Sequence, residues 1–426
     1  MDANTPQDSR SLLLASLQDV NFKKLLIGQV ISVFGDRVNQ TALLSIVVYV
    51  TGNTAKYSAD ILFWAVLPLL IFSPFTMALV DRFDRRKTLI FADVARALLV
   101  SSLPLLMLFI KHYYVVYATV FLVGCFTAFF NPCRLAMMPN ILPSRLLMPA
   151  NAIFSQAILI VTLVAMPSGG FLVDKLGHVV GFLLNGATYL LSAIFILQLH
   201  PSTGADQGAP LRENSHPFLD FRDGFLYTWK NRPIFFQIIF FGIMQCLVAI
   251  FFIAFLSYGI DVLHLKVGGT NLLFAALGIG MALGAFCLGH SQNLAELPCL
   301  PMLMMGGAGI GMVTLSRVTS SWLGALVLFG IGFCAAMVMI PPDTYLQKHV
   351  PDNVRGRVFA VRGVLVGGAF LISLQLSKAL IHHLGTPSTL RWLGIASILL
   401  GGIIALIWNS KTRQTPSQPI NLNINP

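Results

Sequence analysis

Charged side chains are scarce in this sequence: Asp, Glu, Lys and Arg make up 11% of its 426 residues. Soluble domains carry roughly 25% charged and 45–50% apolar residues, whereas 56% of this chain is hydrophobic. The composition therefore excludes an ordinary soluble enzyme and a disordered chain. We also expect no nucleic-acid partner, although the formal net charge is +11. A membrane protein with several spans remains.

The chain also lacks the motifs of several kinds of site. Its six cysteines include no Cys-x-x-Cys pair, and its histidines do not have the spacing of metal ligands. No phosphate-binding Gly-x-x-x-x-Gly-Lys-[Ser/Thr] loop occurs, so the protein is not itself an ATPase. We therefore expect neither an enzyme nor a resident metal or cofactor. No cleavable signal peptide is expected in residues 1–23, which carry three aspartates.

Long apolar runs are what the sequence does contain. A membrane-spanning helix needs about 20 apolar residues, whereas a membrane barrel would show short alternating segments. We therefore predict an all-α membrane protein. Twelve spans are expected at residues 24–50, 57–80, 88–110, 114–130, 148–173, 179–199, 234–258, 270–289, 298–316, 322–340, 358–384 and 390–408.

The longest polar segment between spans divides the chain into two six-helix halves. The predicted parts are a cytoplasmic segment at 1–23 within the first half at 1–199, a cytoplasmic loop at 200–232, the second half at 233–408 and a cytoplasmic tail at 409–426. The loop should contain an amphipathic helix over 218–229, because aromatic residues recur there at helical spacing.

The positive charges predict the orientation. If both termini are cytoplasmic, 19 of the 28 Lys and Arg residues fall in cytoplasmic segments, 6 on the opposite side and 3 within spans. Such an excess is typical of cytoplasmic loops. The net charge then reflects topology near anionic lipid rather than a surface for nucleic acid.

The loop after the second predicted span carries a recognisable pattern. Residues 77–90, MALVDRFDRRKTLI, resemble the signature G-x-L-a-D-R-x-G-R-[KR]-x-x-[LI] of the major facilitator superfamily, with Met77 and Asp84 in place of its glycines. The resemblance implies that this loop latches the cytoplasmic helix ends. The implied gating residues are Asp81, Arg82, Asp84, Arg85 and Arg86. A loop that only sets topology would explain the arginines but not the two acids.

Further segments are similar to bacterial exporters related to macrolide and enterobactin efflux proteins. They are FNPCRLAMMP at 130–139, LDFRDGFLY at 219–227 and VPDNVRGRVF at 350–359, whose Arg355 and Arg357 are also expected to act in gating. The resemblance implies a monomeric twelve-span secondary transporter of the bacterial inner membrane, powered by the proton gradient. The antiporter motif of the fifth span, G-P-x-x-G-G, is only partly present at 166–170.

The first predicted span supplies the main candidate site. Gln29, Ser32, Asp36 and Gln40 share one helix face, and a charge in mid-membrane is costly enough to need a function. We expect Asp36 to couple proton or substrate movement, or else to form a structural pair. Further candidates to line the central cavity that the resemblance implies are Arg37, Gln156, Gln237, Gln245 and Gln375.

Asp93 and Arg96 lie three residues apart in the third predicted span, a spacing that favours an internal ion pair. We expect this pair to support structure or gating rather than to bind substrate.

These observations predict a secondary transporter that exports a siderophore or an amphipathic drug by proton antiport and alternating access. Three alternatives stay open: a lysophospholipid flippase, a metal-ion exporter similar to ferroportin, and a membrane scaffold that transports nothing.

Overall fold

The structure is a computed structural model that describes residues 9–46, 54–80, 83–110, 112–200, 217–290, 297 and 299–412. Every regular element in these ranges is a helix, which confirms the all-α prediction. The elements are α1 (Ser9–Gln18), α2 (Val20–Ile46), α3 (Thr54–Val80), α4 (Arg85–Phe109), α5 (Tyr114–Ile141), α6 (Ser144–Leu176), α7 (His178–Leu197), α8 (Pro217–Lys230), α9 (Arg232–Ser257), the π-helix η2 (Tyr258–Val262), α10 (Val267–His290), α12 (Leu300–Leu315), α13 (Ser321–His349), α14 (Asp352–Leu384) and α15 (Thr386–Thr412).

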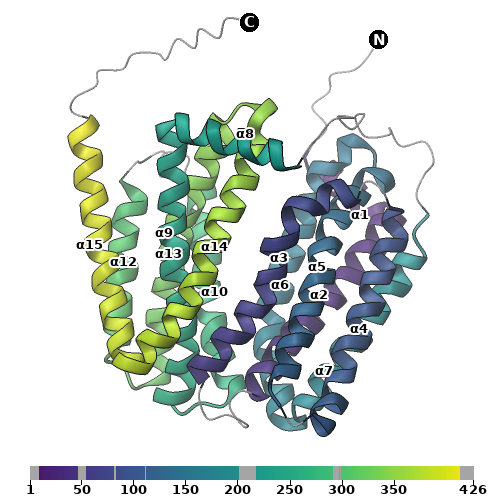
Figure 1. The fold of residues 1–426 in the computed structure, drawn as a ribbon, viewed down its shortest axis with the longest axis horizontal. Helices are drawn as coiled ribbons and strands as arrows, with labels where there is room; N and C mark the ends of the chain where they lie inside the picture. Colours follow the sequence, from purple (N-terminus) through teal and green to yellow (C-terminus); the bar gives the residue numbers. More distant parts are fainter. Residues whose placement is uncertain are drawn as a thin grey trace, which may run out of the picture. The chain divides into compact units, whose positions relative to one another are not determined.

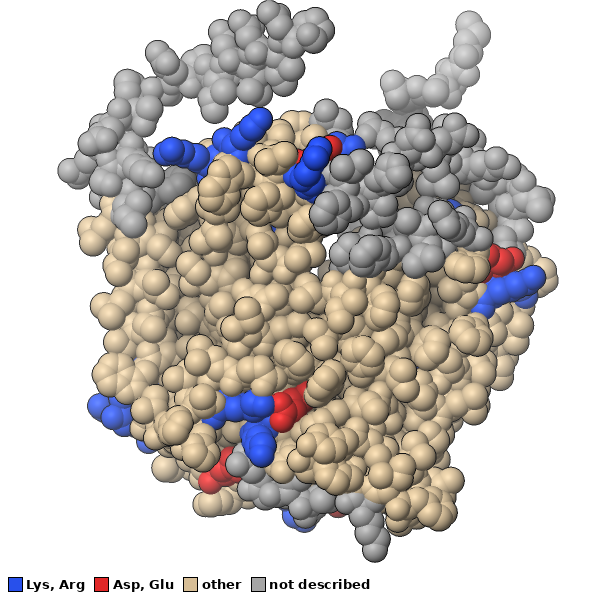
Figure 2. All heavy atoms as spheres, viewed as in Figure 1, with Lys and Arg blue, Asp and Glu red and all other residues tan. Residues whose placement is uncertain are grey.

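Ten helical segments in the described ranges are long and apolar enough to cross a membrane. The charged α2 and the 16-residue α12 are not among them, and both coincide with predicted spans. On the face drawn in Figure 2, charged side chains gather toward the two ends of the helices and leave a broad uncharged surface between. The total of twelve spans and the cytoplasmic location of both termini stay predictions.

By packing, the described helices fall into two compact units. The first contains α1 to α9, η2, α10 through Ala275, and α14 through His383; the second contains the rest of α10 with α12, α13 and α15. The first unit thus includes helices from both predicted six-helix halves, and the division into halves at 200–232 stays a prediction.

Helices α2 to α7 of the first unit pack side by side (Figure 1). Their starts and ends follow local chemistry. Asp84 caps α4, because its carboxylate accepts a hydrogen bond from the Lys87 backbone N–H at 2.9 Å. Gly177 ends α6 and precedes α7 with a φ of 83°, a conformation that glycine adopts without strain.

Glycine residues allow α2 and α7 to approach closely. A Cβ atom on Gly35 would lie 1.9 Å from Thr188 Oγ1 and 2.5 Å from Asn185 Oδ1, closer than real contacts permit. On α7, a Cβ on Gly181 would lie 2.8 Å from the Cβ of Ala42. Such small residues favour tight helix packing in membranes. As a result, the residue after Gly35 is held against α7.

The helix α8 lies where the amphipathic helix is predicted. Its Phe225 and Trp229 rings stack with centroids 6.1 Å apart, and Trp229 also meets Phe235 of α9 edge-on at 5.2 Å. Both Phe225 and Trp229 keep exposed surface. An aromatic face next to Lys230 suits a helix that lies at the membrane surface.

Candidate functional site

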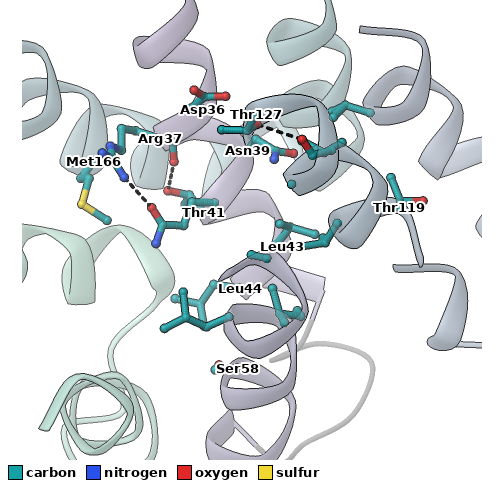
Figure 3. A pocket seen from close by; sticks show the side chains of 18 of the residues that line it. Asp36, Arg37, Asn39, Thr41, Leu43, Leu44, Ser58, Thr119, Thr127 and Met166 are labelled. Atoms are coloured by element: carbon teal, nitrogen blue, oxygen red, sulfur yellow. Dashed lines mark hydrogen bonds between the residues drawn. The ribbon is translucent and has the colours of Figure 1, made fainter. Parts of the chain in front are cut away.

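A cavity of about 330 Å³ lies within the first unit, and Figure 3 shows part of its lining. This volume is near the lower limit of small-molecule pockets. Most of the wall is apolar, from α3, α4, α5, α9 and α10. Its polar or charged side chains are Asp36, Arg37, Asn39, Gln40, Thr41, Ser58, Thr119, Thr127, Tyr189 and Asn271. The cavity is therefore amphipathic, with its only two formal charges among these lining residues on α2.

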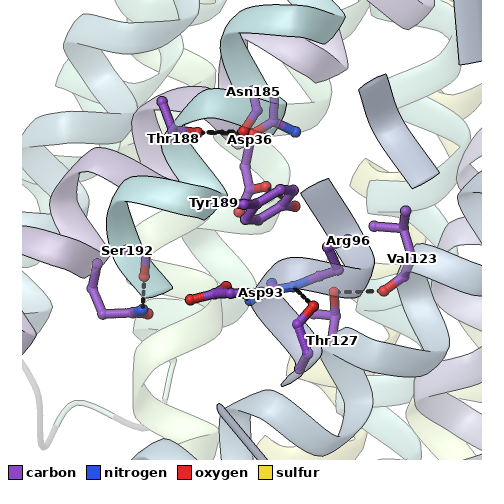
Figure 4. Close-up of polar contacts among 11 residues, drawn as sticks. Asp36, Asp93, Arg96, Val123, Thr127, Asn185, Thr188, Tyr189 and Ser192 are labelled. Carbon is purple, nitrogen blue, oxygen red and sulfur yellow. Dashed lines mark hydrogen bonds and ion pairs between the residues drawn. The ribbon is translucent and has the colours of Figure 1, made fainter. Parts of the chain in front are cut away.

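Asp36 lies against α7. The hydroxyl of Tyr189 donates a hydrogen bond to Asp36 Oδ1, and Asn185 lies beside the same carboxylate (Figure 4). Asp36 also interacts electrostatically with Arg96 of α4. The predicted mid-span acid is therefore held by a hydroxyl and faces a cation rather than lipid.

Asp93 and Arg96 form a buried ion pair on α4, with 0% and 4% of their side-chain surfaces exposed. The Arg96 guanidinium lies between two aromatic rings, 4.2 Å from the Phe130 centroid and 4.4 Å from the Tyr189 centroid. Stacking of this kind favours a desolvated guanidinium. Because Tyr189 contacts both Asp36 and Arg96, one aromatic side chain joins the ion pair to the cavity (Figure 4).

Arg37 lies on a different side of α2 from Asp36. Its Nη1 donates a hydrogen bond to Gln40 Oε1 at 3.2 Å, one turn further along the helix (Figure 3). Thr41 donates to the Arg37 backbone carbonyl at 2.9 Å and in turn accepts from Asn271 Nδ2 of α10 at 2.9 Å. These contacts hold Arg37 at the cavity wall.

The remaining predicted cavity residues divide into two groups. Gln29 and Ser32 are buried between helices, where Gln29 Nε2 donates to Ser192 Oγ of α7 at 3.4 Å, so they do not line the cavity. The other four glutamines are also absent from its lining. Gln156 is exposed, Gln237 and Gln375 are partly buried, and the buried Oε1 of Gln245 has no hydrogen-bond partner among the described residues.

The residues predicted to gate lie mostly at helix ends. Arg85 donates hydrogen bonds to the Ala136 carbonyl and to Asn140 Oδ1, both at 3.0 Å, near the C-terminus of α5. Arg86 donates to the Ile196 and Leu197 carbonyls at the end of α7. Cations at these positions complement the helix dipole.

Two further gating predictions concern α14, whose Arg355 donates to the Val350 carbonyl at 3.2 and 3.1 Å. Arg357 lies 3.9 Å from Asp223 of α8. Asp81 and Arg82 lie outside the described residues, and the gating role of all these residues stays a prediction.

Helices α6 and α10 pack closely against each other at the end of the first unit opposite Asp84. The N–H of Gly268 donates to Asp174 Oδ2 at 2.8 Å, so an acid of α6 caps α10. Asn271 Nδ2 also donates to the Met166 carbonyl at 3.0 Å. Gly170 allows this approach, because a Cβ there would lie 2.5 Å from the Gly268 Cα. The partial antiporter motif at 166–170 therefore lies in a helix–helix junction.

Three polar contacts lie at the same end. Lys378 of α14 pairs with Asp60 of α3 at 2.5 Å, and the Tyr117 hydroxyl donates to the other oxygen of Asp60 at 3.3 Å. Thr54 Oγ1 donates to Asp261 Oδ1 of η2 at 2.9 Å. These contacts thus join helices far apart in sequence at this end of the first unit.

The Gly170→Ala variant is expected to open the junction between α6 and α10, because its added methyl group has no room beside Gly268. Cysteines placed at Thr41 and Asn271, in a chain without the six native cysteines, would report the change. Oxidative cross-linking should be efficient when Gly170 is kept and several-fold weaker in the Gly170→Ala variant. The matched control is Gly242→Ala, since a Cβ there has no atom within 4 Å. Equal cross-linking in both variants would contradict the proposed contact.

Tyr189 and Asn185, which complete the surroundings of Asp36, are not among the residues predicted from the sequence. The sequence does contain a pattern that could have revealed them. The sixth predicted span has polar residues at helical spacing, namely Asn185, then Thr188 or Tyr189, and then Ser192. The buried face of α7 contains these residues. A polar stripe on a second span, like that of the first, predicts a partner for it.

Comparison with known proteins shows several transporters of similar length. A Bacillus amyloliquefaciens protein named as a bacilysin exporter, BacE, is 25% identical over 374 residues, which cover 83% of this chain and 88% of that protein. Macrolide efflux protein A of Streptococcus pyogenes is 24% identical, with 86% and 90% covered. The lysophospholipid transporter LplT of Photorhabdus laumondii is 23% identical, with 91% and 95% covered.

The fold is also found in a solved structure. A bacterial homologue of the human lysosomal transporter Spinster, in an inward-facing and unoccupied conformation, superposes with a TM-score of 0.68. The two sequences are 13% identical, and the match covers 93% of this chain and 98% of that one. This likeness concerns the fold alone.

Residues 25–374 match the Major Facilitator Superfamily, and this match spans most of the chain. The bacterial relatives and the many apolar helices indicate a multi-pass protein of the bacterial inner membrane. The protein is thus a transporter rather than an enzyme, and it belongs to the Major Facilitator Superfamily, among relatives of its exporter branch.

Proposed function

We propose that this protein exports a small amphipathic solute, a siderophore or a drug-like compound, across the inner membrane as a monomer. Alternating access would expose the cavity to each side in turn, and inward proton flow would drive the cycle. The observation that carries the proposal is the amphipathic cavity with Asp36 in its wall. The exporter names of two relatives support the direction of transport.

Asp36 is the proposed coupling group. Its carboxylate can hold a proton or the cationic group of a solute, but a protonated acid no longer attracts a cation. Competition for one acid couples the two movements in opposite directions, which is antiport. The Tyr189 hydroxyl and nearby Arg96 stabilise the charged carboxylate when neither is bound.

The residues at helix ends are proposed to act in gating. Arg85 and Arg86 connect α4 with the ends of α5 and α7, so a movement of α4 would break these hydrogen bonds. The capped junction of Gly268 with Asp174 would have to open for the opposite end of the cavity to become accessible.

The function is tested by comparing a deletion strain of the source bacterium with its parent under iron limitation. Mass spectrometry of medium and cells, with an iron-chelation assay, should find a metabolite that disappears outside and accumulates inside. The wild-type gene should restore secretion, and the Asp36→Asn gene should not. Identical media from the two strains would overturn siderophore export, and susceptibility to amphipathic drugs would then be measured in the same strains.

A lysophospholipid transporter is the second candidate, because LplT covers most of this chain. Spheroplasts of the parent strain would take up fluorescent lysolipid faster than those of the deletion strain if this function is correct. The ferroportin-like alternative is tested separately by calorimetry, in which divalent metal should bind the wild type but not Asp36→Asn.

A further inference from the structure

Two opposite charges from adjacent residues enter the same cavity. Asp36 accepts a hydrogen bond from Tyr189 and faces Arg96, whereas Arg37 is hydrogen-bonded to Gln40. Successive residues of a helix point about 100° apart. The acid and the base therefore occupy different parts of the wall instead of neutralising each other in direct contact.

The Arg37 guanidinium has unused donors. Gln40 accepts from Nη1, but the buried Nε has no hydrogen-bond partner among the described residues. Among the described residues no carboxylate lies within ion-pair distance of Arg37, and Asp36 acts on it only through its charge, whereas Arg96 is paired directly with Asp93. A cation without a contacting anion is costly within a membrane span and is retained where it binds something. Carboxylates are preferred partners, because they accept two parallel hydrogen bonds from a guanidinium.

An aromatic cluster lies in the same cavity. Phe274 of α10 packs edge-on against Phe252 of α9, with centroids 5.9 Å apart, and lies 6.0 Å from Phe255. All three rings line the cavity. They offer an apolar surface to the body of a solute whose charged groups are held on α2.

We propose that the transported solute is a compact amphipathic zwitterion. Its carboxylate binds Arg37, its ammonium group takes the place of the proton on Asp36, and its apolar body lies against the phenylalanine cluster. The inference rests on the proposed function, because it assigns the solute of the same cavity. A purely cationic or neutral amphipath would leave Arg37 without a contacting anion. A lysolipid phosphate could also bind a guanidinium, so the test includes a lysolipid beside the zwitterions.

The test measures binding to the full-length protein in lipid nanodiscs by isothermal titration calorimetry. The probes are 2-naphthylalanine and phenylalanyl-leucine, each as the free zwitterion, the C-terminal amide and the N-acetyl acid. Lysophosphatidylethanolamine is titrated in parallel. At least one zwitterion should bind at least about 10-fold more tightly than its amide, since the amide forfeits a charge-assisted contact.

Variants identify the residue responsible for this preference. Arg37→Gln should remove the preference for the free carboxylate while leaving the affinity for the amide unchanged, and Arg37→Lys should keep part of it. Arg317→Gln is the matched control, because Arg317 is an exposed arginine of the second unit. If Arg37→Gln does not fold, the comparison of acid with amide on the wild type decides the question with Arg37→Lys.

The outcomes separate this inference from the proposed function. Equal affinity for each acid and its amide, no binding by any zwitterion, or preference for the lysolipid overturns the zwitterion inference. Loss of affinity on N-acetylation alone would still support binding of an ammonium group at Asp36, which the proposed coupling requires. Selective zwitterion binding without proton-driven movement of the same probe in proteoliposomes would instead refute proton-coupled export and leave the binding site standing.

Discussion

The Asp36→Asn variant is expected to insert and fold like the wild type and to lose proton-driven transport to the background of protein-free liposomes. An Asn side chain keeps an oxygen that accepts the hydrogen bond from Tyr189, so the contact between α2 and α7 survives. It cannot take up or release a proton, which removes the coupling. We therefore expect a change in the free energy of unfolding of about 1 kcal/mol or less.

The measurement is solute movement in proteoliposomes under an imposed pH gradient, with the amount of folded protein determined by size-exclusion chromatography. Asp19→Asn is the matched control. Asp19 accepts a hydrogen bond from the Phe22 backbone N–H at 2.8 Å near the start of α2, and Asn caps helices equally well. Proton-driven transport by Asp36→Asn at the wild-type rate and abundance would remove Asp36 from the mechanism.

Arg96→Gln should produce the largest loss of stability. It leaves Asp93 buried without its cation, and breaking a buried pair in this way costs about 3–5 kcal/mol. It also removes the stacking of the guanidinium between Phe130 and Tyr189. When variant and wild type are purified in the same detergent, we expect the variant to give less folded protein and to unfold at a lower temperature.

The double variant Asp93→Asn with Arg96→Gln should regain most of that stability, because two neutral amides can hydrogen-bond without an unpaired charge. The two single variants and the double variant together form a double-mutant cycle that isolates the coupling energy. A double variant as unstable as Arg96→Gln alone would show that Asp93 is not the reason for the loss. Transport by a stable double variant would then report whether the Arg96 charge beside Asp36 matters for coupling.

The two predictions concern different parts of one polar network. Asp36 lines the cavity, whereas Asp93 and Arg96 are buried behind Tyr189. Asp36→Asn should therefore change function with little effect on stability, whereas the main effect of Arg96→Gln should be a loss of stability. Tyr189 touches both sides, so a movement of α7 would alter the surroundings of Asp36 and Arg96 together.

Much of this protein follows from its amino-acid order alone. Scarce charges and long apolar runs required membrane-spanning helices, because the bilayer core offers no hydrogen-bond partners and a helix pairs its own backbone N–H and C=O groups. Periodicity within one helix also brought Asp93 and Arg96 together, since residues three apart meet on one face. The same periodicity found the polar face of α2 but did not show that Gln29 and Ser32 would be buried against α7.

Which distant residues meet depends instead on how the helices pack. Tyr189 reaches Asp36 across 153 positions, Asn271 reaches Thr41 across 230, and Lys378 reaches Asp60 across 318. Helical spacing sets the face on which a side chain lies, but the partner depends on which helices pack together and at what depth. That choice is made by close approaches such as Gly35 to Thr188 and Gly170 to Gly268, where the absence of a side chain lets two backbones come together.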